Sequence, residues 1–185
     1  MLELQAGSDD LRARLAAVRL LAMDVDGVLT DGGIMLADDE VELKRFHVVD
    51  GMGLRLAMLA GLTVAWVSGR ESVAVERRAR ELDVVHLLQG VSNKERALAT
   101  LTAELGVDRA AVAYIGDDWN DLPAFSVSGV RFAPASAPAE IKGAVDMVTE
   151  CAGGQGAVRE VCDLLLRAQG KYHAAVEAYL QEARR

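Results

Sequence analysis

LLAMDVDGV, residues 20–28, places a short apolar run directly before two carboxylates. The four residues from Leu20 to Met23 form an unbroken apolar run, which is typical of a strand covered on both faces of a parallel sheet. Asp24 and Asp26 then fall in the turn that leaves this strand. Parallel α/β sheets bind their ligands beyond the carboxyl ends of the strands, so this turn is the first candidate for a functional site.

The same pattern recurs along the chain, where short apolar runs alternate with longer segments of helical spacing. The other predicted strands are 62–67, 84–88, 112–115, 130–133 and 147–148, and the predicted helices are 71–82, 93–105 and 155–169. This alternation predicts an α/β fold with a doubly wound, mostly parallel, Rossmann-like sheet that carries helices on both faces.

Residues 32–48 interrupt the alternation and predict a β-hairpin that projects from the sheet. The apolar residues 34–36 follow two glycines, a polar tip covers 37–40, and a second strand is predicted over 41–48. The chain shows no repeat and no linker-like stretch. We therefore expect residues 1–185 to form one domain, with this hairpin and a C-terminal tail over about 171–185.

Composition argues against several classes of function. Hydrophobic residues make up 51% of the chain and charged residues 26%, so no long stretch is expected to be disordered. The net charge of −8 disfavours nucleic acid and anionic membranes as partners, although local basic residues can still bind an anionic substrate. Cys151 and Cys162 form no C-x-x-C pair, which disfavours a disulfide framework or a zinc site.

Sequence features of export or membrane insertion are absent. No apolar run reaches the roughly 18 residues that a membrane-spanning helix needs. The first ten residues, MLELQAGSDD, lack the basic and apolar regions of a signal peptide. These features predict a cytoplasmic protein.

Polar residues follow two more of the predicted strands. Ser68 ends one of them, and Asp117, Asp118 and Asp121 follow another. Three acids within five residues exceed what helix capping needs, and they repel one another unless a cation lies among them. Mg²⁺ prefers carboxylates together with water and phosphate oxygens, so Asp24 and Asp117 are candidate ligands for it.

This set of residues suits phosphoryl transfer. With a cation offsetting the charge of the phosphate, Asp24 can act as the nucleophile and form an aspartyl-phosphate. Asp26 can protonate the leaving alcohol and later take a proton from the hydrolytic water. Ser68 and Lys94 would hold the phosphoryl group. Each residue alone also fits a turn, a cap or a surface position, so the ordered set carries the prediction.

The ordered set resembles the four motifs of the haloacid dehalogenase superfamily, here Asp24-x-Asp26, Ser68, Lys94 and Gly116-Asp117-Asp118-x-x-Asp121. Within it, residues 20–171 are most similar to the capless phosphatases of 3-deoxy-D-manno-octulosonate 8-phosphate. The stretches that carry this narrower resemblance are DVDGVLTDG at 24–32, FHVVDGMGL at 46–54, QGVSNK at 89–94, AYIGDDWND at 113–121 and GGQGAVREVCDLLLRAQGK at 153–171.

The resemblance implies a magnesium-dependent phosphomonoester hydrolase of lipopolysaccharide precursor synthesis. It implies Asp24 as nucleophile and Asp26 as acid/base, with Mg²⁺ held by Asp24, the Asp26 carbonyl and Asp117. Asp118 and Asp121 would support the metal site. The resemblance also implies a homotetramer in which the 32–48 hairpins meet at the centre and each C-terminal tail reaches a neighbouring site.

Eight residues are expected from the resemblance to face the sugar acid or its phosphate: Asp26, His47, Asp50, Gly51, Arg55, Arg70, Arg78 and Lys94. The arginines give an acidic protein local positive charge suited to a carboxylate and a phosphate. As solvated helix residues they would have no such role. Val49 departs from the family, since many relatives carry arginine there, and this bears on which sugar acid is bound.

The sequence leaves three other functions to be weighed. A sibling phosphatase of a nine-carbon sugar-acid 9-phosphate would carry the same catalytic residues, and the 153–171 stretch favours the eight-carbon substrate. A non-catalytic oligomerisation domain related to that of sialic-acid cytidylyltransferases would lack a catalytic residue or carry a synthetase, and neither applies. A phospho-accepting receiver domain would not carry Ser68 and the later acid cluster.

Overall fold

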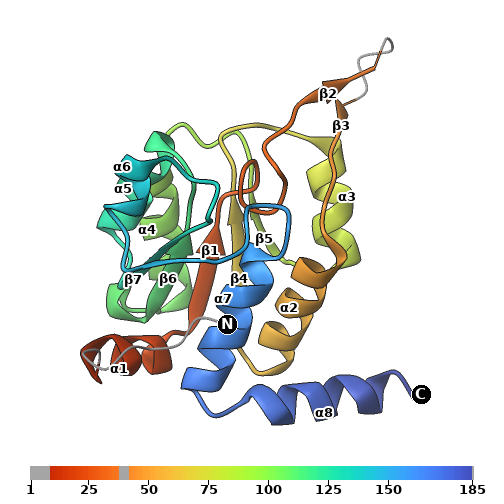
Figure 1. Cartoon of the computed structure of the whole chain (residues 1–185), viewed down its shortest axis with the longest axis vertical. Coiled ribbons are helices and arrows are strands. Elements are labelled where there is room, and N and C mark those ends of the chain that lie inside the picture. Colours follow the sequence, from red (N-terminus) through yellow and green to blue (C-terminus); the bar gives the residue numbers. More distant parts are fainter. Residues whose placement is uncertain (1–8, 38–41, 185) are drawn as a thin grey trace.

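The computed structural model describes residues 9–37 and 42–184. Its centre is a six-stranded sheet with the order β5-β4-β1-β6-β7-β8, in which every neighbouring pair is parallel (Figure 1). The strands are β1 (Leu20–Met23), β4 (Thr63–Val67), β5 (His86–Leu88), β6 (Val112–Ile115), β7 (Val130–Ala133) and β8 (Met147–Val148). The chain winds outward from β1 in both directions, so the predicted doubly wound sheet is confirmed.

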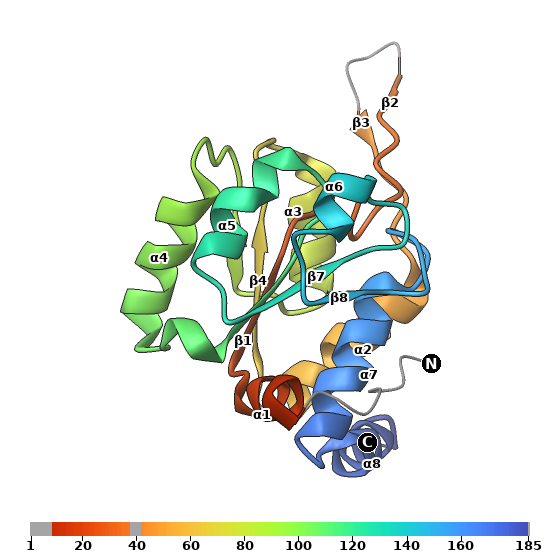
Figure 2. The ribbon, with the colours of Figure 1, turned by 60° about the vertical axis from the view of Figure 1, so that its left-hand side comes forward.

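Helices cover both faces of the sheet (Figure 2). One face carries α1 (Asp9–Ala17), α2 (Val48–Leu59), α3 (Val73–Glu81), α7 (Ala157–Ala168) and α8 (Tyr172–Glu182); the other carries α4 (Lys94–Leu105), α5 (Leu122–Ser126) and α6 (Ala139–Lys142). Two short 3₁₀ helices, η1 (Arg109–Ala111) and η2 (Trp119–Asp121), precede and follow β6. Each face of the sheet has its own hydrophobic core: the first core lies on the face of α2 and α7, and the second on the face of α4. In β1, Leu21 and Met23 point into the first core, while Leu20 and Ala22 point into the second. Both faces of this strand are buried, which is why it is apolar throughout.

The three helices expected from the sequence are present as α3, α4 and α7. Helix α4 illustrates how local residues set its ends. The Asn93 side chain accepts a hydrogen bond from the N–H of Arg96, and Gly106 ends the helix in the left-handed conformation with φ of 61°. Among the described residues, no helix has both the length and the apolar character to span a bilayer.

The predicted hairpin is present, and it projects beyond the sheet in Figure 1. Its strands β2 (Met35–Leu36) and β3 (Glu42–Leu43) pair antiparallel, with Met35 opposite Leu43. Both strands are shorter than the sequence suggested. Of the predicted polar tip, 38–40 lies outside the described residues.

The second strand of this hairpin was predicted to reach Val48, and this prediction is wrong beyond Leu43. Helix α2 begins at Val48 instead. Helix α2 carries apolar residues along one face. Leu54 and Ala57, three positions apart on this face, are both buried in the first core. Two adjacent valines resemble a strand locally, but burial of this face favours the helix.

The predicted C-terminal tail folds largely as α8, which lies across the end of the sheet opposite the hairpin (Figure 1). Ala175 is buried, and Val176 and Tyr179 pack against the first core. Glu182 forms an ion pair of 2.9 Å with Arg55 of α2. The described part of the tail therefore packs on its own chain, and its reach to a neighbouring site stays a prediction.

Candidate active site

The carboxyl ends of β1, β4 and β6 bring the predicted catalytic residues to one edge of the sheet. Met23 pairs with Trp66 on one side and Ile115 on the other, so the residues that follow these strands lie side by side. Strand order reverses direction at this point, where α/β sheets bind ligands. A pocket of about 130 Å³ lies here, lined by Asp24, Asp26, Ser68, Gly69, Arg70, Asp117, Asp118 and Asn120.

The turn after β1 holds the Asp24 carboxylate in place. Its Oδ1 accepts a hydrogen bond from the N–H of Val25 at 2.7 Å, and only 5% of the residue is exposed. Gly27 follows with φ of 93°, a conformation that favours glycine. A Cβ at Gly27 would also collide with the Asp117 carboxylate. The glycine of the DVDG stretch is therefore required by the close approach of these two loops.

Lys94 lies between two carboxylates. Its Nζ is 2.9 Å from Asp24 Oδ2 and 2.7 Å from Asp121 Oδ1, and the side chain is 3% exposed. Burial alone would lower the pKa of Lys94, but the two carboxylates outweigh it and hold this pKa above its usual value. The buried lysine therefore stays charged.

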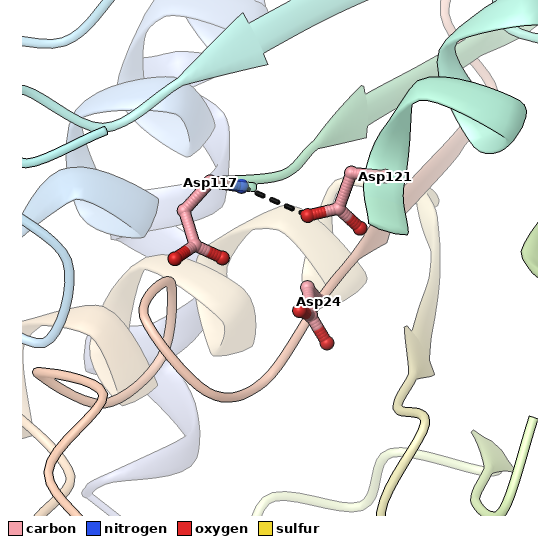
Figure 3. Close-up of side chains that lie close together, drawn as sticks. All are labelled: Asp24, Asp117 and Asp121. Carbon is pink, nitrogen blue, oxygen red and sulfur yellow. Dashed lines mark hydrogen bonds between the residues drawn. The ribbon is translucent and has the colours of Figure 1, made fainter. Parts of the chain in front are cut away.

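Asp121 uses both oxygens of its carboxylate within the protein. Oδ1 accepts hydrogen bonds from Lys94 and from the Tyr114 hydroxyl at 2.8 Å. Oδ2 accepts from the backbone N–H groups of Asp117 at 2.9 Å and Asp118 at 3.3 Å, the first of which is drawn in Figure 3. Asp121 therefore orients the loop that carries Asp117. Tyr114 is part of the same hydrogen-bond network, and no pattern in the sequence singles it out.

The acidic residues fit a divalent cation. Asp24, Asp117 and Asp121 each offer an oxygen within 4.8 Å of the others (Figure 3). Asp117 Oδ1 is buried and has no hydrogen-bond partner among the described residues. Burial and the neighbouring carboxylates raise the pKa of Asp117 to about 7, and burial together with Asp121 raises that of Asp24 to about 6. A cation among these oxygens would offset both effects.

The raised pKa values predict how stability depends on pH without metal. Because each folded-state pKa lies above the usual 3.8, the protonated carboxyls stabilise the fold at low pH, and this contribution is lost as pH rises through about 6 and 7. In chelator, Asp117→Asn should raise the melting temperature over wild type by about 3–6 °C more at pH 8 than at pH 4.5. Calorimetry at the two pH values tests this, and a gain that does not grow with pH would contradict it.

Ser68 and Asp26 complete the pocket. Ser68 is 2% exposed, and its Oγ accepts a hydrogen bond from the N–H of Arg70 at 3.1 Å. Asp26 lies at the mouth of the pocket, where its carboxylate contacts Lys44 and lies 3.9 Å from Arg70 Nε. The sequence pattern does not single out Lys44, because nothing in the sequence distinguishes it from its neighbour Arg45.

Two predicted substrate residues have other contacts in the structure. Asp50 is 1% exposed, and its carboxylate accepts hydrogen bonds from the N–H groups of Gly156 at 3.2 Å and Arg159 at 2.8 Å, at the start of α7. A Cβ at Gly51 would collide with the Arg78 guanidinium. In this structure Asp50 caps a helix and Gly51 lies against an arginine, and the expectation that both face the substrate stays a prediction.

Three other predicted substrate residues, Arg55, His47 and Arg78, are not among the residues that line the pocket. Arg55 lies on the flank of α2, in ion pairs of 2.9 Å with both Asp83 and Glu182, so the structure does not bring it to the pocket. His47 immediately precedes α2, and its Nδ1 is buried with no hydrogen-bond partner among the described residues. Arg78 lines a different cleft of about 670 Å³ beside β3 and α3.

Comparison with known proteins identifies the family to which this chain belongs. Residues 81–161 match a family model described as haloacid dehalogenase-like hydrolase. The 3-deoxy-D-manno-octulosonate 8-phosphate phosphatase KdsC of Escherichia coli (strain K12) is 46% identical over 168 residues, which cover 91% of this chain and 89% of that protein. The enzyme of the same name from Haemophilus influenzae is 43% identical over 161 residues, covering 87% and 89%.

Comparison with solved structures points to the same family. A crystal structure of 3-deoxy-D-manno-octulosonate 8-phosphate phosphatase from Moraxella catarrhalis, in complex with magnesium, phosphate and a KDO molecule, matches with a TM-score of 0.89 at 38% identity, covering 93% of this chain and 99% of that one. The cobalt-bound enzyme from Haemophilus influenzae matches with a TM-score of 0.86 at 41% identity, covering 90% and 99%. This chain belongs to the family of 3-deoxy-D-manno-octulosonate 8-phosphate phosphatases, within the haloacid dehalogenase-like hydrolases.

Proposed function

We propose that this chain is a magnesium-dependent phosphatase that hydrolyses 3-deoxy-D-manno-octulosonate 8-phosphate in lipopolysaccharide precursor synthesis. The observation that carries the proposal is the convergence of Asp24, Lys94 and Asp117 at the ends of two neighbouring strands, with Asp26 at the mouth of the same pocket. The Moraxella catarrhalis relative, whose structure holds magnesium, phosphate and KDO, supports the choice of substrate.

The reaction proceeds in two steps on Asp24. A carboxylate oxygen of Asp24 attacks the phosphorus, the bond to the sugar oxygen breaks, and a proton passes from Asp26 to that oxygen. This leaves an aspartyl-phosphate. Asp26, now ionised, takes a proton from water while the water oxygen attacks the phosphorus, which frees Asp24 and releases phosphate. Ser68 and Lys94 hold the phosphoryl oxygens throughout.

Magnesium is proposed to be held by Asp24, the backbone carbonyl of Asp26 and Asp117, with Asp118 and Asp121 supporting these residues. When bound, the ion neutralises negative charge on the phosphate and on the carboxylates around it. The unpartnered Asp117 oxygen and the raised pKa values of Asp24 and Asp117 support this assignment.

The sugar is proposed to lie outside the pocket that receives the phosphate. At about 130 Å³ this pocket is smaller than the roughly 300 Å³ or more of typical small-molecule sites. The cleft beside β3 and α3 is about 670 Å³ and is lined by Lys44, Arg77 and Arg78 among others. Glu42, Glu71 and Glu81 line the same cleft, so it is the arginines, rather than a net positive charge, that suit the carboxylate of a sugar acid.

Phosphate release from a panel of esters tests the proposal. The panel comprises the eight-carbon substrate, a nine-carbon sugar-acid 9-phosphate, glucose 6-phosphate and p-nitrophenyl phosphate, each with Mg²⁺ or with chelator. We expect the highest kcat/KM for the eight-carbon ester and no activity in chelator. A preference for the nine-carbon ester would favour the sibling phosphatase. Inactivity on every ester would favour a non-catalytic oligomerisation domain.

Arg78→Ala tests recognition of the sugar acid. We expect kcat/KM for the eight-carbon substrate to fall about ten- to hundredfold, because a charge-assisted contact is lost, while p-nitrophenyl phosphate falls less than about threefold. Arg80→Ala removes an exposed arginine from the same helix and is the control. Equal losses on both esters would exclude Arg78 from sugar recognition and leave the chemistry of Asp24 unaffected.

We also propose that residues 1–185 form one domain and that the protein is located in the cytoplasm. The hairpins of four such chains are proposed to pack together and form a homotetramer. Ile34, Met35, Leu36 and Leu43 are 53%, 48%, 73% and 53% exposed. A two-stranded hairpin with an uncovered apolar surface is stabilised by burying it against another chain.

Leu36→Asp should lower the mass of the assembly without unfolding the sheet core, because it places a charge on the apolar surface of the hairpin. Light scattering at micromolar concentration measures the mass, and circular dichroism checks the fold. Val85→Asp, at a valine that is 86% exposed outside the hairpin, is the matched control and should leave the mass unchanged. A monomeric wild type would contradict the assembly.

A further inference from the structure

The foot of the hairpin contacts the active site through a buried lysine. Lys44 directly follows β3, and its side chain is only 1% exposed. Its Nζ contacts the Asp26 carboxylate and lies 3.4 Å from Glu42. Because a buried ammonium group is costly unless it is paired, these carboxylates account for its position.

Lys44 belongs to a closed ring of four charged side chains at the mouth of the pocket. Asp26 lies between two cations, with Lys44 at Oδ1 and Arg70 Nε 3.9 Å from Oδ2. Glu42 closes the ring, since it accepts a hydrogen bond from Arg70 Nη2 at 2.9 Å and faces Lys44. The Ser72 hydroxyl, Arg70 and Lys44 keep the pKa of Glu42 below its usual value. The ring therefore joins the turn after β1, the loop after β4 and the hairpin.

The next residue along the chain provides a contrast. Arg45 has a side chain that is 65% exposed, and it pairs with Asp31 rather than with Asp26. Two adjacent cations at the foot of the hairpin thus have different surroundings, one buried against the proposed acid/base and one in solvent. This makes Arg45 a matched control for Lys44.

The ring also separates the phosphate pocket from the larger cleft. Asp26 and Arg70 line the pocket, whereas Glu42 and Lys44 line the cleft. Lys44 therefore reaches the Asp26 carboxylate from the side of the cleft. A sugar in that cleft would place its leaving oxygen between the phosphate and this side of Asp26.

We propose that Lys44 is a positioning residue that holds the Asp26 carboxylate toward the leaving oxygen and makes its orientation depend on the folded hairpin. This inference rests on the proposed function, in which Asp26 transfers a proton to that oxygen. Since Lys44 acts through Asp26, its effect depends on how much the leaving group needs a proton. p-Nitrophenolate leaves readily without one, whereas the more basic phenolate needs it.

The test compares the first-turnover release of phenol from phenyl phosphate with that of p-nitrophenol from p-nitrophenyl phosphate. Lys44→Met should slow the phenyl ester by about tenfold or more and the p-nitrophenyl ester by less than about threefold. Lys44→Arg, which keeps the cation, should return the ratio of the two rates to within about threefold of wild type. Arg45→Met should leave both rates unchanged.

Equal losses on both esters, or no loss on either, would overturn the proposal. In an Asp26→Asn background, Lys44→Met should cause no further loss, and a further tenfold loss there would show that Lys44 acts on the phosphate itself. Thermal unfolding checks each variant, and Lys44→Gln replaces Lys44→Met where that variant does not fold. A wild type inactive on both aryl esters and on the eight-carbon substrate would instead refute the proposed function, so the two failures are distinguishable.

Discussion

The Asp24→Asn variant is expected to fold normally and to lose phosphatase activity by about 10³-fold or more. The amide retains the shape of the side chain and can still accept the hydrogen bond from Val25, but it is no nucleophile and a poorer ligand for Mg²⁺. Burial raises the pKa of Asp24 to about 6, so a neutral side chain at this position removes an unfavourable buried charge near pH 7. Loss of activity should therefore occur without loss of stability.

A chemical trap and a matched variant make this prediction specific. In wild-type protein quenched during turnover, borohydride should reduce an aspartyl-phosphate at residue 24 to homoserine, and mass spectrometry of the peptide detects it. Asp108→Asn makes the same change at the capping residue of η1, at the other end of β6, and should retain activity. More than a few per cent of activity in Asp24→Asn would exclude the covalent mechanism.

The sheet and the central part of the site were predictable from the sequence because both depend on local patterns. The strand 20–23 is apolar throughout since its two faces enter two different cores. Parallel strands then place the residues that follow them along one edge, so Asp24, Ser68 and Asp117 come together without any knowledge of side-chain packing.

Contacts between distant segments were not predictable in this way. Asp50 forms hydrogen bonds at the start of α7, more than 100 residues later in the chain, and Arg55 pairs with Asp83 and Glu182. Lys44 reaches Asp26 only because the hairpin folds back over the turn after β1. A charged residue gives the same signal in a sequence whether it meets solvent, a helix end or a catalytic acid.

Lys94→Met is expected to damage both stability and activity, because Lys94 is the cation shared by Asp24 and Asp121. Removing one partner from a buried ion pair costs about 3–5 kcal/mol, since the remaining charge is left without compensation. Here the lysine lies within 3 Å of both carboxylates and is 3% exposed. The free energy of unfolding measured in chelator should fall by about this amount, while Lys142→Met in α6, outside this cluster, should change it little.

The kinetic consequence separates Lys94 from the residues that recognise the sugar. Its proposed partner is the phosphoryl group, which every ester carries, so Lys94→Met should lower kcat/KM about 10²- to 10³-fold for the eight-carbon substrate and p-nitrophenyl phosphate alike. Added Mg²⁺ should restore part of the stability, because a cation among Asp24, Asp117 and Asp121 offsets their repulsion, but it should not restore the rate. A loss confined to the eight-carbon ester, or a rate that recovers together with stability, would show that Lys94 contributes to folding or sugar binding rather than to phosphoryl transfer.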